Sequence, residues 1–132
     1  MKLIVCVDDF NGMMFNNRRQ SQDRALRERI LRLVGEAPIC MTPYTKKQFE
    51  DTDNIIVANE PPKNIPEAYY FWEDGEVDVS WFDTVIVYRW NRHYPADRHF
   101  NTELLSGFEL SSADEFKGYS HDRITEQIFI KR

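Results

Sequence analysis

The sequence predicts a single α+β domain in which a mixed, mostly antiparallel sheet is combined with two helices. The chain has 132 residues, the size of one domain, so residues 1–132 are expected to form one unit. Short apolar runs rich in β-branched and aromatic residues recur along it and are separated by polar turns. Only two stretches have helical character, so few strand–helix–strand crossovers are expected, and a mixed sheet of about four to six strands fits best.

The first predicted element is a buried strand over residues 2–7, a continuous β-branched run that ends at Asp8-Asp9. Residues 10–20 contain two pairs of turn-forming residues, Asn11-Gly12 and Asn16-Asn17. We expect this segment to be a short hairpin or ordered loop with three side chains packed inward: Met13, Met14 and Phe15.

The clearest helix covers residues 22–34. Ser21 is expected to be its N-cap, Asp23 to lie favourably in its first turn, and Gly35 to end it. Four apolar side chains share one stripe, namely Leu26, Ile30, Leu33 and Val34. Three charged side chains share the opposite face, namely Arg24, Glu28 and Arg32.

The remaining elements are mostly strands. A short helix is predicted over residues 43–51, after a short strand at 38–41. Buried strands are predicted at 54–58 and 84–88, and a further strand at 68–72. Near the end of the chain, residues 108–110 and 127–130 are expected to pair antiparallel around a turn at Lys117-Gly118.

Composition excludes several classes of protein. Hydrophobic residues make up 42% and aromatic residues 14%, which is too apolar for a disordered chain. No apolar run approaches the ~18 residues of a membrane span, and the five apolar residues before Asp8 are too few for a signal peptide. The two cysteines, Cys6 and Cys40, are expected to be buried reduced thiols, which is typical of a cytoplasmic protein.

Charge is distributed unevenly along the chain. The net charge is −5, yet residues 1–35 carry seven basic and four acidic side chains. Long duplex DNA or RNA requires a broad basic face, so it is not an expected partner. A local arginine cluster on an acidic protein indicates a small anionic ligand or an acidic patch on another chain.

Recognised catalytic and metal motifs are absent from the sequence. The three histidines, His93, His99 and His121, form no metal-binding pattern, and no phosphate-binding glycine motif or nucleophile elbow occurs. We therefore predict no catalytic residue, metal or cofactor. Asp8-Asp9, at the end of a strand, has two interpretations: a catalytic acid or metal ligand, or a solvated strand terminus, which is favoured.

The first candidate binding segment leads into the helix. Two arginines and several polar groups precede the N-terminus of the helix, and a helix N-terminus attracts anions. The candidate binding residues of this segment are Phe15, Arg18, Arg19, Gln20 and Ser21. The alternative is that the arginines pair with the acidic residues of segment 48–83. On the helix flank, Arg24 and Arg27 are candidates for an oligomer axis or for solvated surface.

The second candidate segment follows the strongest strand, where ligand sites of mixed sheets gather. It offers Arg89 and Arg92 for phosphate and Asn91 for a base or ribose edge, and we expect the arginine heads to reach solvent or ligand. Trp72 and Phe82 are candidate stacking rings. The alternative is that the aromatic rings of this region are buried in the hydrophobic core.

Several of these residues resemble those of the phage anti-Thoeris sponge proteins: Arg18-Arg19-Gln20-Ser21, Trp72, Phe82 and Arg89-Trp90-Asn91-Arg92. Those are small oligomeric proteins that sequester cyclic ADP-ribose isomers, and some also bind cyclic oligonucleotides. The resemblance implies a homo-oligomer in the host cytoplasm that captures a cyclic nucleotide signal without turnover and so counters bacterial immunity. It also implies that Arg24 and its neighbours line a pocket between subunits.

Two other families compete. Three segments resemble parts of dihydrofolate reductases: residues 3–12 the first strand, residues 54–61 a middle strand and residues 108–131 the final hairpin. The proline-tryptophan pair and the glycine-rich cofactor motif of that family are absent. The opening also resembles chains labelled ribonuclease Z, whose metal-binding histidine motif is absent here. Two further functions therefore stay open: a degenerate reductase-like or phosphodiester-processing enzyme using Asp8 or Asp9, and an inhibitor of a defence effector that docks through an acidic face.

Overall fold

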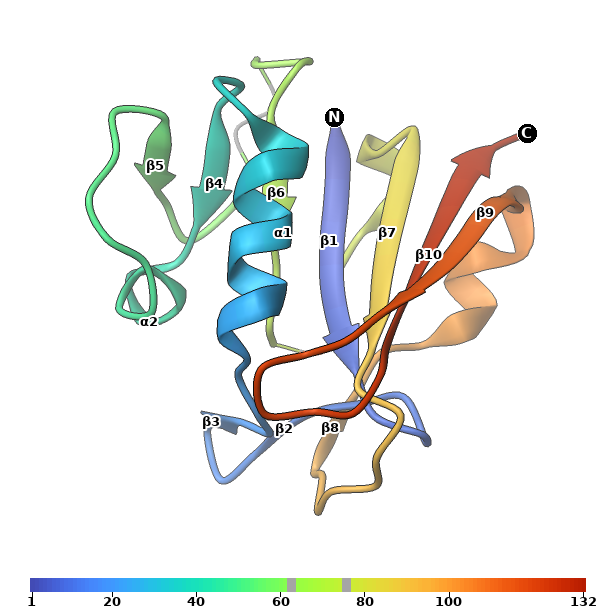
Figure 1. Ribbon diagram of the computed structural model, residues 1–132. Coiled ribbons are helices and arrows are strands. Elements are labelled where there is room, and N and C mark those ends of the chain that lie inside the picture. The colour runs from blue at the N-terminus through green and yellow to red at the C-terminus, as the bar shows by residue number, and fades with distance from the viewer. Residues whose placement is uncertain (62–63, 75–76) are drawn as a thin grey trace.

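The structure is a computed structural model that describes residues 1–61, 64–74 and 77–132 (Figure 1). A seven-stranded sheet with the order β5–β4–β6–β1–β7–β10–β9 forms the body of the molecule. Its strands are β1 (Lys2–Val7), β4 (Ile39–Met41), β5 (Ile55–Val57), β6 (Tyr69–Phe71), β7 (Thr84–Arg89), β9 (Phe108–Phe116) and β10 (Ile124–Lys131). A smaller sheet has the order β3–β2–β8 and consists of β2 (Gly12–Phe15), β3 (Arg18–Arg19) and β8 (Arg98–His99).

The helices are few and short. The α-helices of the described ranges are α1 (Arg24–Val34), which lies across one face of the large sheet, and α2 (Pro43–Lys46) (Figure 1). The 3₁₀-helices are η1 (Val79–Trp81) and η2 (Thr102–Gly107). Within the described part of the chain, no helix has the length and apolar character needed to cross a membrane.

The predicted single α+β domain with a mixed sheet and two α-helices is confirmed. The large sheet is less antiparallel than expected. β1 runs parallel to β6 and β7, and β4 runs parallel to β5 and β6, whereas β10 runs antiparallel to β7 and β9. The parallel pairing arises because each connection along β1, β4, β5, β6 and β7 returns the chain to the same end of the sheet before the next strand begins.

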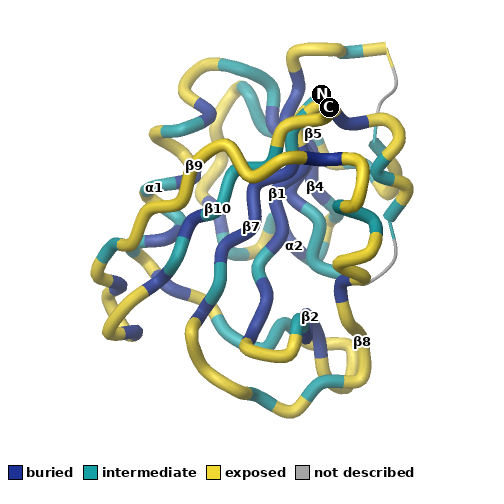
Figure 2. Tube along the Cα trace, turned by 90° about the vertical axis from the view of Figure 1, so that its right-hand side faces the viewer, coloured by how far each residue is buried: buried dark blue, intermediate teal, exposed yellow. Residues whose placement is uncertain are grey.

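The core has two layers because β1 and β7 are buried on both faces (Figure 2). On one face Leu3 and Val85 pack with aromatic residues beneath η1 and η2. On the other face Ile4 and Ile86 pack against three α1 side chains: Leu26, Ile30 and Val34. Continuous apolar strands are required in this position, as the sequence of both strands indicated.

Helix α1 begins two residues later than expected, since Asp23 and not Ser21 is its N-cap. Asp23 has an extended backbone, and its carboxylate accepts hydrogen bonds from the N–H groups of Ala25 and Leu26. Gly35 ends the helix with a φ of 60°, as expected of a glycine at this position. Ser21, being outside the helix, is available for another contact.

Three other expectations were wrong in detail. Helix α2 ends at Lys46 and does not continue to residue 51. Strand β5 is only partly buried, because it lies at the edge of the sheet and pairs on one side, with β4. Met13 and Met14 are buried as expected, but Phe15 is 42% exposed because it lies beside the Asn16-Asn17 turn at the end of the β2–β3 hairpin. The final hairpin, β9–β10, is confirmed.

Candidate functional site

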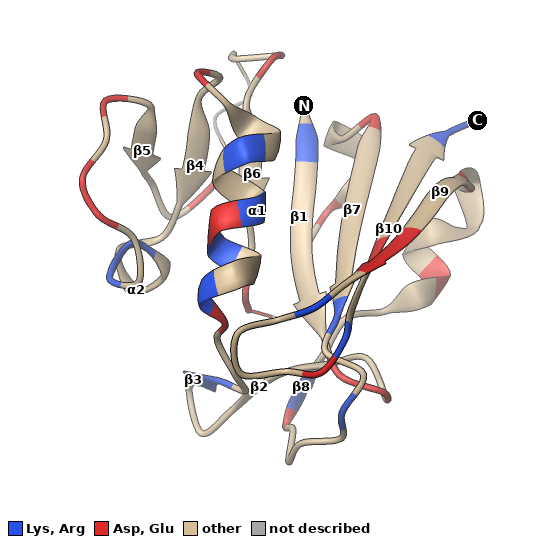
Figure 3. Ribbon diagram, viewed as in Figure 1, with Lys and Arg blue, Asp and Glu red and all other residues tan. Residues whose placement is uncertain are grey.

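The carboxyl ends of β1, β4, β6 and β7 meet at one edge of the large sheet, because these strands are parallel. The small sheet, the N-terminus of α1 and the loop 117–123 lie along the same edge (Figure 1). Figure 3 shows basic residues on α1, β3 and β8 and at the end of β7 near this edge, interspersed with acidic residues. Ligand sites of parallel sheets are typically found in this position.

Asp23 is the most highly connected group at this edge. Its side chain is fully buried, and besides capping α1 it accepts hydrogen bonds from the N–H groups of Tyr119 (3.0 Å) and Ser120 (2.8 Å). Its Oδ2 atom lies 2.9 Å from Nδ1 of His121, whose ring is also buried. Burial alone would raise the pKa of Asp23, but these hydrogen bonds outweigh it and hold the pKa well below its usual value.

Two hydroxyl groups lie on the opposite side of the His121 ring. Ser21 Oγ and Tyr94 Oη are each 3.0 Å from Nε2. Because the ionised Asp23 carboxylate can only accept, the proton of the neutral imidazole lies on Nδ1 and Nε2 accepts from a hydroxyl. Trp90 stacks on the ring at a centroid distance of 4.6 Å. The arrangement therefore orients a histidine between a buried carboxylate and two hydroxyls.

A small cavity lies beside Ser21. Its volume of about 10 Å³ corresponds to one water molecule, and among the residues that line it are Ser21, Arg27, Gln48, Glu73 and Trp90. Cys6 also lines it, and burial raises the pKa of its thiol well above its usual value, so the thiol is protonated at neutral pH.

A larger cleft of about 380 Å³ opens on the other side of Glu73. Tyr44 and Trp72 contribute aromatic rings to it, Asn17 and Asn59 contribute amides, and Arg98 contributes a guanidinium. Trp72 stacks on Tyr70 with its ring centroid 5.4 Å away, and its indole Nε1 is buried without a hydrogen bond to any described residue. The cleft thus combines rings, amides, one cation and two carboxylates, those of Glu73 and Asp74, which pair with Arg19 and Arg98.

Glu73 lines both the cavity and the cleft, and Arg19 is its ion-pair partner. Arg19 makes a two-fold ion pair with Glu73, with Nε–Oε2 and Nη2–Oε1 distances of 2.9 and 3.2 Å, and its guanidinium stacks over Tyr44 at 4.3 Å. Thr45 Oγ1 donates a further hydrogen bond to Glu73. For Arg19 the ion-pair interpretation is therefore correct, and its charge is compensated within the chain.

Asp8 is buried and hydrogen-bonded within the chain. It accepts hydrogen bonds from the N–H groups of Gly12 and Tyr94 and from the Gln20 amide. Burial opposes ionisation, but the hydrogen bonds from Gly12, Phe10 and Tyr94 lower the pKa of Asp8 below its usual value. The expectation that this strand end is solvated is wrong for Asp8, whereas Asp9 is exposed.

The residues predicted around β7 divide into core and surface. Phe82 is 1% exposed and stacks on Tyr70, so its assignment as a ligand-stacking ring was wrong and it belongs to the core. Arg89 is partly buried, its guanidinium donates to Gln127 Oε1 and Asn11 Oδ1, and burial lowers its pKa, so it is less exposed than expected and is already engaged within the chain. Asn91 and Arg92 are exposed.

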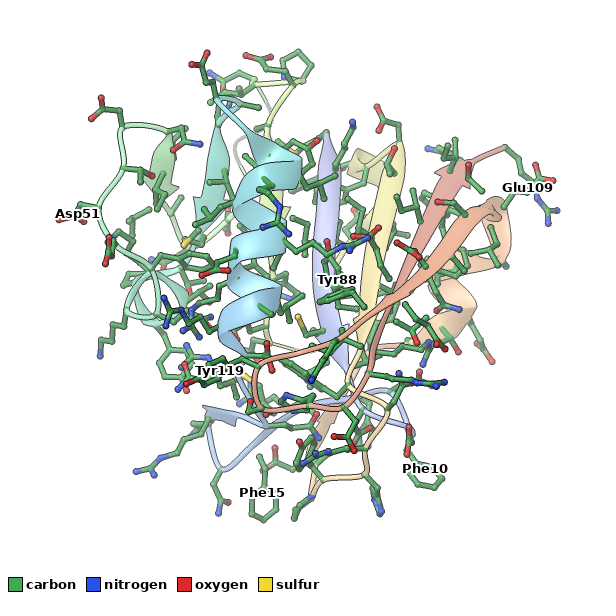
Figure 4. The ribbon with its side chains drawn as sticks, viewed as in Figure 1. Phe10, Phe15, Asp51, Tyr88, Glu109 and Tyr119 are labelled. Carbon is green, nitrogen blue, oxygen red and sulfur yellow. The ribbon has the colours of Figure 1, made fainter. Side chains whose placement is uncertain are left out.

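Most of the other predicted site residues lie on the carboxyl edge, but they do not converge on one point. Phe15 and Arg18 are exposed on the β2–β3 hairpin, where Phe15 extends away from the body of the molecule (Figure 4). Arg24 is exposed and pairs with Glu28. Ser21 and Arg27 share the small cavity, Trp72 lines the cleft, and Gln20 is bonded to Asp8.

The partners that complete these sites were not predicted from the sequence: Asp23 as an acceptor, Tyr44, Tyr94, Arg98 and His121. His121 is 98 residues from Asp23 and 100 from Ser21, so no local spacing joins them. The available signal was a serine and an aspartate directly before a helix. The described residues contain no group of three His, Cys, Asp or Glu side chains placed to hold a metal ion.

Comparison of the sequence with protein-family models and with curated proteins found no match. The geometry of the carboxyl edge is therefore the basis for assigning a function.

Proposed function

We propose that the protein captures a small anionic nucleotide in the cleft at the carboxyl edge of its sheet. The observation that carries this proposal is the convergence of two aromatic rings, two amides and a guanidinium in one open cleft of about 380 Å³. Ligand pockets typically have volumes of about 300–1,000 Å³ and combine apolar walls with a few polar groups. Aromatic faces and amide groups suit a nucleobase, and arginine suits a phosphate.

Arg98 is the residue best placed to bind the phosphate. It contacts Asp74, and its Nη2 atom donates to Asn17 Oδ1 at 3.1 Å. Arg98 and Asp74 are each 43% exposed, and an ion pair this open to solvent contributes little to stability, about 0–1 kcal/mol. A phosphate can therefore replace Asp74 as the partner of Arg98 at little cost in free energy. Replacing Glu73 as the partner of Arg19 would cost more, because that pair is more buried.

The ligand class and the mode of action extend this proposal. The resemblance to sponge proteins implies a cyclic nucleotide signal that is held and released unchanged in the host cytoplasm. It also implies a homo-oligomer in which the exposed Arg24 faces a second subunit. Neither part is needed for the cleft to bind a nucleotide.

Calorimetry and thermal denaturation with cyclic ADP-ribose isomers and cyclic dinucleotides test the proposal. A ligand at 100 times its dissociation constant should stabilise the protein by about 2.7 kcal/mol. Arg98→Ala should weaken binding about ten- to hundredfold, because it removes a charge-assisted hydrogen bond. Arg32→Ala is the matched control, since Arg32 is an exposed arginine at the far end of α1.

Two outcomes would contradict the proposal. One is that no nucleotide raises the melting temperature at millimolar concentration. The other is that Arg98→Ala and Arg32→Ala bind a nucleotide equally well. Mass spectrometry of the ligand recovered from the complex then tests capture, which requires the ligand to be unaltered.

A further inference from the structure

We propose that Ser21, His121 and Asp23 form a nucleophilic triad that hydrolyses small carboxylic esters. This activity goes beyond nucleotide capture and does not depend on it, because Ser21 and Asp23 line the small cavity and none of the three residues lines the cleft. The three residues come from the segment before α1, the α1 N-cap and the β9–β10 loop.

The distances within the group are those that nucleophilic catalysis requires. An activated hydroxyl must lie within about 2.6–3.2 Å of its base, and the base must be oriented by a third group. Ser21 Oγ is 3.0 Å from His121 Nε2, and His121 Nδ1 is 2.9 Å from Asp23 Oδ2. The order serine–imidazole–carboxylate places the basic nitrogen on the serine side.

Asp23 is held rigidly as an anion, which gives the histidine a defined orientation. Four backbone N–H groups donate to its carboxylate, two from α1 and two from the loop 117–123. An ionised carboxylate stabilises the imidazolium that forms when His121 accepts a proton. Trp90 adds to this effect, because its stacked ring favours a cation on the imidazole.

Two groups are placed to stabilise a developing oxyanion. Tyr94 Oη lies on the same side of His121 as Ser21, and when Ser21 donates to Nε2 the tyrosine hydroxyl is free to donate to a substrate oxygen. Arg27 lines the same cavity as Ser21 and supplies a positive charge.

The space around Ser21 limits the acyl group. The cavity has the volume of about one water molecule, which accommodates an acetyl methyl group but not a longer chain. Ser21 is partly exposed, so the alcohol part of the ester can extend into solvent. The expected substrates are therefore acetate esters.

The reaction balances without any further reagent. Ser21 Oγ attacks the ester carbonyl carbon while its proton moves to His121 Nε2, and the tetrahedral intermediate expels the alcohol, which takes the proton from Nε2. Water then attacks the acyl carbon and gives a proton to Nε2. Ser21 leaves with that proton, and the net products are acetate, the alcohol and a proton released from acetic acid.

Hydrolysis of p-nitrophenyl acetate and phosphonylation by a fluorophosphonate probe test the triad in the full chain. The probe should add its mass at Ser21, located by peptide mapping. Ser21→Ala should abolish labelling and reduce hydrolysis to background, whereas Ser112→Ala, at an exposed serine of β9, should leave both unchanged. His121→Ala should slow hydrolysis about 10²–10⁴-fold, and Tyr94→Phe should slow it about 10²–10³-fold.

A second variant keeps the test decisive if His121→Ala fails to fold. Ser21→Cys should place a thiol beside His121 that iodoacetamide alkylates rapidly at neutral pH, while Cys6 and Cys40, whose pKa values are raised by burial, stay unmodified. Absence of probe at Ser21 in the folded wild-type chain would overturn the triad. So would an introduced thiol that reacts no faster than a cysteine in a denatured chain.

Discussion

Two buried aspartates, Asp8 and Asp23, stand at the same edge of the sheet but have different surroundings. Both are at most 2% exposed, and for both the hydrogen bonds from backbone N–H groups outweigh burial and lower the pKa. The partners of Asp8 are backbone groups and the Gln20 amide, none of which titrates near neutral pH. The partners of Asp23 include His121, which connects it to two hydroxyls.

The difference shows what makes a buried carboxylate chemically useful. Each aspartate ties together distant segments: Asp8 joins the end of β1 to Tyr94, and Asp23 joins α1 to the loop 117–123. That structural role is common to both. Only Asp23 has a titratable partner that reaches a hydroxyl group, so only Asp23 can support proton transfer.

The largest expected effect comes from removing either carboxylate. Asp23→Ala leaves two helix N–H groups, two loop N–H groups and a buried histidine without their acceptor. Asp8→Ala leaves three backbone N–H groups without theirs, and of these the Gly12 N–H is buried. Urea denaturation should show a loss of about 3–5 kcal/mol for Asp23→Ala and somewhat less for Asp8→Ala.

The isosteric variants separate structure from chemistry. Asp23→Asn should remove serine labelling by the fluorophosphonate probe, because it changes the tautomer of His121, whereas Asp8→Asn should leave labelling intact in the folded fraction. A cost below about 1 kcal/mol for Asp23→Ala would show that solvent replaces its partners, contrary to its complete burial.

Acid unfolding is expected to be steep because both aspartates have lowered pKa values. A carboxylic acid with a lower pKa in the folded state contributes stability that is fully present above its unfolded pKa, about 3.9 for aspartate, and that is lost as the pH falls through the folded pKa. Melting temperatures should therefore be flat above about pH 5 and fall below about pH 4. Asp23→Asn and Asp8→Asn should each flatten this fall.

Asp51 provides the control for the acid series. Its pKa is lowered by Lys46, but its side chain is 97% exposed, and such a pair contributes little to stability. Asp51→Asn should leave the acid profile nearly unchanged. A profile that responds to Asp51→Asn as strongly as to Asp23→Asn would mean that surface charge, and not the buried network, governs acid stability.

How much of this could be predicted from the sequence depends on the range of each contact. The strands β1 and β7 and the apolar stripe of α1 follow from local periodicity, and all three were predicted. The N-cap was misassigned because Ser21 and Asp23 are both good caps, and the choice is made by Tyr119 and Ser120, which donate to Asp23 from nearly a hundred residues away. Periodicity carries no information about such a distant partner.

The candidate site was predicted less well than the fold for the same reason. A pattern of arginines and aromatic rings does not distinguish Phe82, which is in the core, from Trp72, which lines a cleft. Nor does it show that Arg19 is compensated by Glu73, 54 residues away. Parallel pairing was underestimated because the connection from β4 to β5 contains only the four-residue helix α2, which is too short to show the pattern of a regular crossover helix.

Gly12 and Gly118 each lie against one of the two aspartates, and substituting them is expected to have the smallest effect of the variants compared. A Cβ atom at Gly12 would lie 3.0 Å from Asp8 Oδ1 and 2.7 Å from the Ala96 Cβ, and one at Gly118 would lie 2.7 Å from Asp23 Oδ2 and 2.9 Å from the His121 carbonyl oxygen. Both substitutions to alanine should therefore cost about 1–3 kcal/mol through overpacking, whereas Gly107→Ala, with no atom within 4 Å of its Cβ, should be nearly neutral by thermal denaturation. Gly118→Ala should also slow labelling of Ser21, since the added methyl group displaces the carboxylate that orients His121, while Gly12→Ala should destabilise the fold without changing the labelling rate of the folded protein. Equal effects of the two variants on labelling would mean that the Asp23 contact does not set the position of His121.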